Sequence, residues 1–211
     1  MKTFSKDISI FIGAGWGKYL IPYAEANMDV IVIGFEPNPT AFIQLFENTK
    51  YLTNVILVPK AVSYFNSDVT FNITKLPDGD LGCSSLLEYS DNIDNLITNG
   101  MEHSEMVDIE CIRIDTFLDG LDFKVNTIKN IVVDAQGYDL ECLLSTGEYS
   151  NLIEMGEVEV VTYENALYKN QQNTISNVVN WLYTMGFVIY DIRDNDHYNP
   201  GTEMNIFFKK I

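Results

Sequence analysis

Short apolar runs recur along the first part of the chain, and each is followed by a turn and a segment that suits a helix. Residues 8–12 form the first run, and residues 30–35 form a second that is continuous and rich in β-branched side chains. Continuous runs of this kind are typical of strands buried on both faces of a parallel sheet. The expected helices cover residues 18–27 and a segment that begins with Asn38 as its N-cap and Pro39 at the first helical position.

The same alternation returns in the second half of the chain. Further strands are expected at residues 55–58, 131–134, 157–163, 187–191 and 205–209, the last two as a closing pair. Helices are expected at 138–145 and along the apolar stripe from Ile175 to Leu182, with Gly186 as a natural stop.

Residues 63–125 break this rhythm with two alternating stretches, 69–73 and 107–114, and a loop between them. We therefore expect an insertion between the third and fourth strands. The pattern as a whole predicts an α/β fold: a mostly parallel, doubly wound, seven-stranded sheet with helices on both faces and a closing antiparallel strand. No repeat, linker or shift in composition divides the chain, which predicts a single domain over residues 1–211.

Charge narrows the range of partners. Among 211 residues, 13 Lys and Arg stand against 30 Asp and Glu, which gives a formal net charge of −17. Such an acidic chain repels phosphate groups, so nucleic acid and anionic membranes are not expected as partners. No apolar stretch approaches the roughly 20 residues of a membrane-spanning helix. The three cysteines form no CxxC pair and are expected to be reduced thiols, which favours a cytosolic (cytoplasmic) protein.

Candidate chemistry gathers at the ends of the first two expected strands. Gly13, Gly15 and Gly17 form a turn in which backbone N–H groups can approach a ligand. Lys18 stands where a dinucleotide fingerprint would have its third glycine, so the spacing suits a nucleoside without a pyrophosphate. Glu36 follows the second strand, where a carboxylate can accept hydrogen bonds from both ribose hydroxyls. A nucleoside cofactor is therefore expected; the alternative is a structural turn beside a solvated carboxylate.

Acidic residues at two later strands are the candidates for catalysis. Asp134 ends the fourth strand at the same crevice, and the alternative that it is the N-cap of the next helix is compatible with that position. Glu159 on the fifth strand is the second candidate, with Glu157 beside it in the alternation. His103 and His197 stand in polar stretches that are typical of solvated loops. Asp134 has no obvious carboxylate partner at short range, so no metal is expected.

Several blocks occur in the order and at the spacings of FkbM-type methyltransferases, which the chain resembles over nearly its whole length. The most specific are FEPNP at residues 35–39 and DAQGYDLE at residues 134–141. The resemblance implies a Rossmann-like class I methyltransferase fold, S-adenosyl-L-methionine as cofactor, and O-methylation of hydroxyls on sugars and polyketide-type metabolites. It implies that the glycine-rich turn holds the methionine part of the cofactor, Glu36 its ribose, and Ala61 its adenine. The implied cofactor-binding residues are Gly13, Ala14, Gly15, Trp16, Gly17, Glu36, Pro37, Asn38, Ala61 and Asp134.

Three positions depart from the pattern of that family. Phe11 stands where the family usually has an Asp that contacts the amino group of the cofactor, directly or through water. Gly15 stands where it usually has Asn. Gln136 replaces the acid of a DxEG block, a variant that the family also shows.

Three functions compete on this basis. The leading one is an O-methyltransferase that acts by in-line displacement on a small-molecule or glycan acceptor with a free hydroxyl, with Asp134 or Glu159 as base or substrate anchor. The second is a non-catalytic module that binds a cofactor or a partner, which the departure at Phe11 motivates. The third is a nicotinamide-dependent oxidoreductase, which Lys18 disfavours. The insertion, including a loop at residues 82–86, is expected to choose the acceptor.

Overall fold

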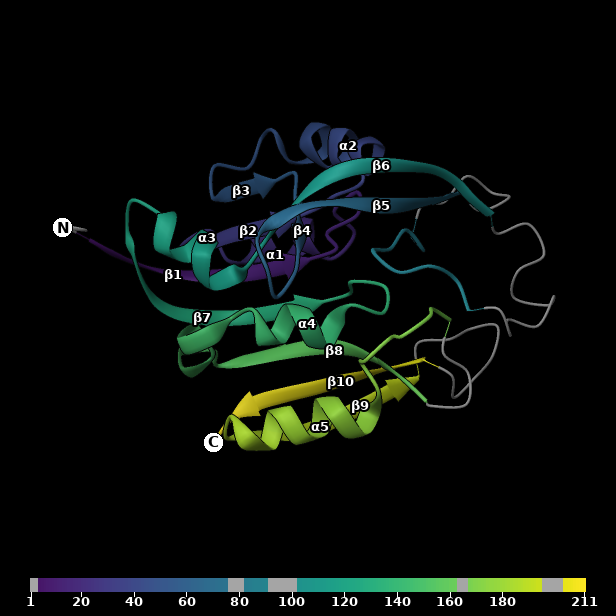
Figure 1. Ribbon diagram of the computed structural model, residues 1–211. Coiled ribbons are helices and arrows are strands. Elements are labelled where there is room, and N and C mark those ends of the chain that lie inside the picture. Colours follow the sequence, from purple (N-terminus) through teal and green to yellow (C-terminus); the bar gives the residue numbers. More distant parts are fainter. Residues whose placement is uncertain (1–3, 76–81, 91–101, 163–166, 195–202) are drawn as a thin grey trace.

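A computed structural model describes residues 4–75, 82–90, 102–162, 167–194 and 203–211 (Figure 1). Its main element is a seven-stranded sheet with the strand order β3-β2-β1-β7-β8-β10-β9. The strands of this sheet are β1 (Ser5–Ile12), β2 (Ile31–Phe35), β3 (Val55–Val58), β7 (Lys124–Val133), β8 (Met155–Val161), β9 (Phe187–Asp194) and β10 (Glu203–Lys210).

The strand pairing confirms the predicted mostly parallel sheet. β1 pairs in parallel with both β2 and β7, β2 pairs in parallel with β3, and β7 with β8. β10 runs antiparallel to its two neighbours, β8 and β9, and so closes the sheet as expected. Five strands therefore point the same way: β3, β2, β1, β7 and β8. Their carboxyl ends lie along one edge of the sheet, on the right of Figure 1.

Helices cover both faces of the sheet. On one face, α1 (Leu20–Ala26) packs Leu20 and Ala24 against Phe11 and Val32. The opposite face carries the larger core, to which α3 (Ile114–Gly120), α4 (Asp139–Leu144) and α5 (Ile175–Thr184) contribute buried side chains. In α2 (Pro39–Thr49), the predicted cap is confirmed, since the side chain of Asn38 accepts hydrogen bonds from two backbone N–H groups of the first turn.

The insertion forms a second sheet of three strands in the order β4-β6-β5, which are β4 (Ala61–Val62), β5 (Ser67–Lys75) and β6 (Glu102–Ile112). The expected alternating stretch at 107–114 is wrong at its end, because β6 stops at Ile112 and Ile114 begins α3. Arg113, the N-cap of α3, makes no side-chain cap, so the usual sequence sign of a helix start is missing. β7 also begins at Lys124, well before residue 131, because polar residues interrupt its apolar pattern.

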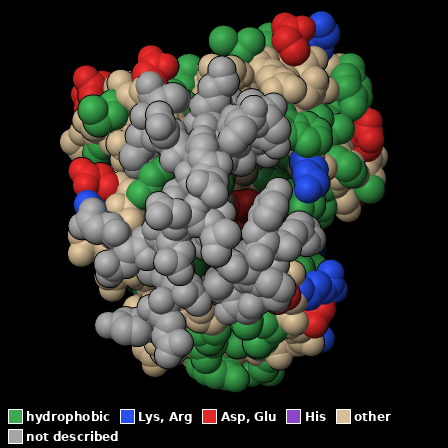
Figure 2. Space-filling model, turned by 90° about the vertical axis from the view of Figure 1, so that its right-hand side faces the viewer, with side chains coloured by type: hydrophobic (Ala, Val, Ile, Leu, Met, Phe, Trp, Pro, Cys, Tyr) green, Lys and Arg blue, Asp and Glu red, His purple; other side chains and the backbone are tan. Residues whose placement is uncertain are grey.

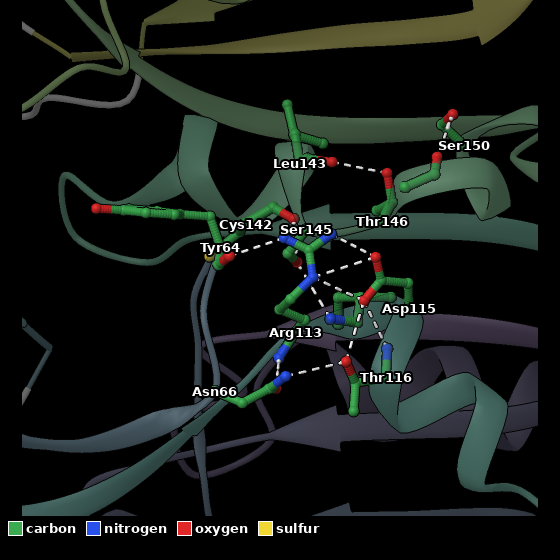
Figure 3. Close-up of polar contacts among 12 residues, drawn as sticks. Tyr64, Asn66, Arg113, Asp115, Thr116, Cys142, Leu143, Ser145, Thr146 and Ser150 are labelled. Atoms are coloured by element: carbon green, nitrogen blue, oxygen red, sulfur yellow. Dashed lines mark hydrogen bonds and ion pairs between the residues drawn. The ribbon is translucent and has the colours of Figure 1, made fainter.

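Arg113 joins the segment between β4 and β5 to α3 (Figure 3). Its guanidinium donates to the carboxylate of Asp115, with Nε 2.8 Å from Oδ1, and its Nη1 donates to the carbonyl oxygen of Tyr64 at 2.7 Å. Its backbone N–H donates to Oδ1 of Asn66 at 2.9 Å. The side chain thus joins the loop after β4 to the start of α3.

The cysteines match the expectation from the sequence: Cys83 is half-buried, Cys111 and Cys142 are buried, and all three are free thiols. Of the helices in the described ranges, none is long and apolar enough to cross a membrane.

Candidate active site

The carboxyl ends of β1, β2 and β7 open into a cavity of about 540 Å³. Figure 2 looks onto this edge and shows a hollow beside the grey residues, with an acidic side chain in its depth. The wall includes the glycine-rich turn, the start of the loop after β2, and the loop after β7. The insertion contributes Phe71, Gly82, Ser84 and Leu86, so it reaches the site as expected. Cavities of this size bind molecules of cofactor size.

The glycine-rich turn places backbone rather than side chains against the cavity. Gly13, Gly15 and Gly17 have φ angles of 74°, 54° and 99°, a region that favours glycine. The N–H of Gly13 donates to the carbonyl oxygen of Phe35 at 3.0 Å, which ties the turn to β2. A Cβ at Gly13 would lie 1.9 Å from the carbonyl oxygen of Asp134, whereas a Cβ at Gly15 would meet nothing within 4 Å. The turn therefore packs tightly at Gly13 and leaves open space at Gly15.

Glu36 lies at the end of β2 with its carboxylate inside the protein. The residue is only 6% exposed, which rules out the alternative of a solvated loop residue. Its Oε2 accepts a hydrogen bond from the N–H of Gly15 at 2.7 Å, and its Oε1 accepts one from the N–H of Asn38 at 2.8 Å. Burial raises the pKa of Glu36 to about 7, although the two hydrogen bonds lower it and the charge of Asp134 raises it further. Each carboxylate oxygen can accept one more hydrogen bond, which suits a vicinal diol such as ribose.

Asp134 follows β7 and also lines the cavity. Its Oδ1 accepts a hydrogen bond from Nε2 of Gln136 at 2.7 Å. The amide oxygen of Gln136 in turn lies 2.9 Å from the hydroxyl of Tyr168, and its backbone oxygen accepts from Oγ of Ser85 at 2.7 Å. Burial raises the pKa of Asp134, while Gln136 and the charge of Lys18 lower it. Gln136 thus connects the carboxylate to the insertion.

Asp139 shapes the loop that carries Asp134, and sequence reasoning missed it. Its carboxylate is fully buried and accepts hydrogen bonds from the N–H groups of Ala135 at 2.7 Å and Gly137 at 3.1 Å, and from Nδ2 of Asn173 at 2.8 Å. The alternative that Asp134 is the N-cap of α4 is wrong, because Tyr138 holds the N-cap position and the carboxylate of Asp134 accepts from Gln136 instead. An acid in the first turn of a helix that follows a glycine-containing loop was the available signal.

The other predicted site residues divide between the cavity wall and its support. The implied cofactor residues that line the cavity are Gly13, Ala14, Gly15, Trp16, Glu36, Pro37, Ala61 and Asp134. Asn38 is buried behind the wall as the cap of α2, and its Nδ2 donates to Oγ of Ser84 at 3.3 Å. Gly17 supports the turn from behind, against α1 and α2.

The remaining catalytic candidates do not line this cavity. Glu159 is buried on β8, where its backbone oxygen accepts from Asn173. His197 and the side chain of His103 lie outside the part of the chain that the structure describes. Within that part, no group of three or more His, Cys, Asp or Glu side chains is placed to hold a metal ion.

Comparison with known proteins assigns this geometry to a family. The family model described as the methyltransferase FkbM domain matches residues 12–189. No curated protein sequence gives a match.

Solved structures with similar folds include fibrillarin from Aeropyrum pernix in complex with natively bound S-adenosyl-L-methionine. It is 9% identical with a TM-score of 0.51, and the match covers 99% of this chain and 68% of fibrillarin. A protein from Streptococcus mutans, provisionally described as a methyltransferase and solved in complex with SAH, is 11% identical with a TM-score of 0.53, and the match covers 99% and 90% of the two chains. At these identities the likeness shows the fold, that of Rossmann-like class I methyltransferases.

Proposed function

Because the chain belongs to the FkbM methyltransferase family, whose methyl donor is S-adenosyl-L-methionine, we propose that it is an O-methyltransferase acting on a hydroxyl group of a sugar or glycan. The observation that carries this proposal is that Glu36 and Asp134, at the ends of β2 and β7, line one cavity together with neutral polar groups of the insertion. We assign the carboxylate of Glu36 to the cofactor and the carboxylate of Asp134 to the acceptor.

The residues present fit the cofactor. The open space at Gly15 admits a ligand against the backbone, and both oxygens of Glu36 have capacity for the two ribose hydroxyls. Ala61 and Pro37 line the same cavity as Glu36 and would flank the adenine. When bound, the cofactor supplies a methyl group on a sulfonium, which is transferred with its C–S bond broken and the electron pair kept by sulfur.

Asp134 is the group proposed to receive the acceptor's proton. Burial raises its pKa toward the range in which a carboxylate works as a general base, and the amide of Gln136 fixes one of its oxygens. The hydroxyl-bearing side chains Ser84 and Tyr138 line the cavity, so a polyhydroxylated acceptor would lie against polar groups there. We also propose a cytosolic location, since the described cysteines are all free thiols.

The test is transfer of a labelled methyl group from S-adenosyl-L-methionine to panels of sugars and oligosaccharides, with amines and carboxylic acids as competing classes. The proposal expects label on sugars in a form that resists mild base, as an ether does and an ester does not. The Asp134→Asn variant should lose transfer, while the exposed Asp68→Asn should retain it. Transfer to amines or carboxylates alone would contradict O-methylation of sugars, and cofactor binding without transfer to any class would favour a non-catalytic module.

A further inference from the structure

A second, smaller cavity of about 40 Å³ lies beside the glycine-rich turn. It shares Gly13, Ala14, Tyr19 and Asp134 with the large cavity, so the two are neighbours across the turn. A space of this volume holds a group as large as a few water molecules.

Two carboxylates and two aromatic residues, Phe11 and Tyr19, are among the residues that line the small cavity. Glu157 reaches it from β8 and Asp134 from the end of β7, while Phe11 of β1 forms an apolar wall. Phe11 packs edge-on against Tyr23 of α1, with ring centroids 5.3 Å apart, so β1 itself offers no charge here. Glu157 sits beside Val132, the residue that pairs with Phe11 on β1.

The two carboxylates are each held by one amide. Oε1 of Glu157 accepts from Nδ2 of Asn205 at 2.8 Å, as Oδ1 of Asp134 does from Gln136. Within the described residues, no donor is recorded for the second oxygen of either carboxylate. Two cations act on these carboxylates: Arg193, which is paired with Asp191 at 2.7 Å, and Lys18, which lowers the pKa of Asp134 and lines the large cavity rather than the small one.

Two such carboxylates repel each other unless a cation lies between them. Burial and the charge of Asp134 raise the pKa of Glu157, while Arg193 and Asn205 lower it. An ammonium group carries the opposite charge, can donate to the oxygen of Glu157 that Asn205 does not use, and fits the volume.

We propose that Glu157 binds the α-ammonium group of the methionine part of S-adenosyl-L-methionine in the small cavity, while Asp134, on the border of the two cavities, keeps its free oxygen for the acceptor. Glu157 is then a specificity-determining residue that supplies from β8 the charge that Phe11 does not supply from β1. This inference rests on the proposed function, because it takes the cofactor to lie along the glycine-rich turn.

Calorimetric titration with S-adenosylhomocysteine and with its deamino analogue, in which hydrogen replaces the α-amino group, tests the assignment. Glu157→Gln keeps an acceptor oxygen for Asn205, removes the negative charge, and replaces the other oxygen with an NH2 group that cannot accept from an ammonium group. We expect this variant to bind S-adenosylhomocysteine at least about tenfold more weakly than the wild type, and the deamino analogue equally well. Glu154→Gln, a substitution of an exposed residue directly before the same strand, should leave both affinities unchanged.

Each of the other possible results of the titration leads to a single conclusion. Unchanged affinity of Glu157→Gln for S-adenosylhomocysteine would overturn the inference and leave the proposed function standing. An equal loss for both ligands would also overturn it, because the effect would not depend on the ammonium group. Failure of the wild type to bind S-adenosylhomocysteine would overturn the proposed function and this inference with it.

Discussion

Cofactor binding should depend on the protonation of Glu36, and the structure sets both the sign and the size of the effect. In the free protein the pKa of Glu36 is raised to about 7 by burial. Ribose hydroxyls donate to a carboxylate, so they bind the ionised form and hold it ionised. Below pH 7, binding must therefore release the proton of Glu36.

The expected change follows from the fraction of free protein that is ionised. With a pKa of about 7, that fraction falls from about nine-tenths at pH 8 to about one-tenth at pH 6, so the affinity for S-adenosylhomocysteine should fall about tenfold over this range. Titration calorimetry in buffers of different ionisation enthalpy measures both the affinity and the proton released. The Glu36→Gln variant should bind S-adenosylhomocysteine weakly at both pH 8 and pH 6, because residue 36 then no longer titrates.

Glu47→Gln is the matched control, because Glu47 is exposed on α2 and pairs with Lys50. It should show the wild-type pH profile. The reasoning is refuted if the wild-type affinity changes by less than twofold between pH 6 and 8, or if Glu36→Gln keeps the wild-type slope.

The same pKa predicts how the stability of the free protein varies with pH. The folded pKa of Glu36 lies above its unfolded value of 4.5, so the folded state binds the proton more tightly. The stability from this group is fully present below pH 4.5 and is lost as the pH rises to about 7, by about 3 kcal/mol. Between pH 5 and pH 7.5, urea denaturation should show a loss of stability in the wild type that exceeds the loss in Glu36→Gln by about 2 kcal/mol, the contribution of Glu36 over this range. Equal losses in the two proteins would contradict the assignment.

Three further predictions test other parts of the structure. Asp134→Asn should reduce methyl transfer at least about a hundredfold, the usual worth of a general base, with folding intact by circular dichroism; near wild-type turnover would contradict its role. In urea denaturation, Gly13→Ala should destabilise the protein by more than about 3 kcal/mol or prevent folding, because the new Cβ would lie 1.9 Å from a backbone oxygen. Gly15→Ala should cost only about 1 kcal/mol, since the space there is open and only the left-handed φ is unfavourable for alanine. Arg113→Ala should cost about 2 kcal/mol in urea denaturation through its lost charged hydrogen bonds, while Lys50→Ala on the surface should cost less than about 0.5 kcal/mol; equal costs would contradict the anchor.

The parts of the fold that the sequence predicts well are those where local and tertiary preferences agree. The runs that became β1, β2 and β3 are apolar on both faces, and Asn38 with Pro39 marks the start of α2 by its own side-chain chemistry. The glycine-rich turn is equally predictable from the sequence, because the left-handed φ angles at Gly13, Gly15 and Gly17 favour glycine.

Elements that depend on distant residues are harder to predict. α3 begins at Ile114 without a side-chain cap from Arg113. Its start is fixed by Ser145, a residue beyond β7, whose Oγ accepts from the N–H of Ile114 and whose carbonyl oxygen accepts from the N–H of Asp115. The first part of β7 is polar in sequence and is a strand because it pairs with β1.

In the site, sequence spacing predicted the acids at the ends of strands but not their partners. The contact of Asp139 with Asn173 and the small cavity shared by Asp134 and Glu157 join segments that are far apart along the chain. Only the folded sheet brings these groups together. The roles of Asp134, Glu159 and the cofactor-binding residues stay predictions for the experiments above.

The central claim is that the large cavity at the carboxyl edge of the sheet holds the methyl donor along the glycine-rich turn. A crystal structure of the protein with S-adenosylhomocysteine tests it most directly. The account predicts both ribose hydroxyls within about 3 Å of the carboxylate of Glu36, with the amino-acid part of the ligand beside residues 13–17. A ligand bound elsewhere, or one whose ribose faces away from Glu36, would contradict it.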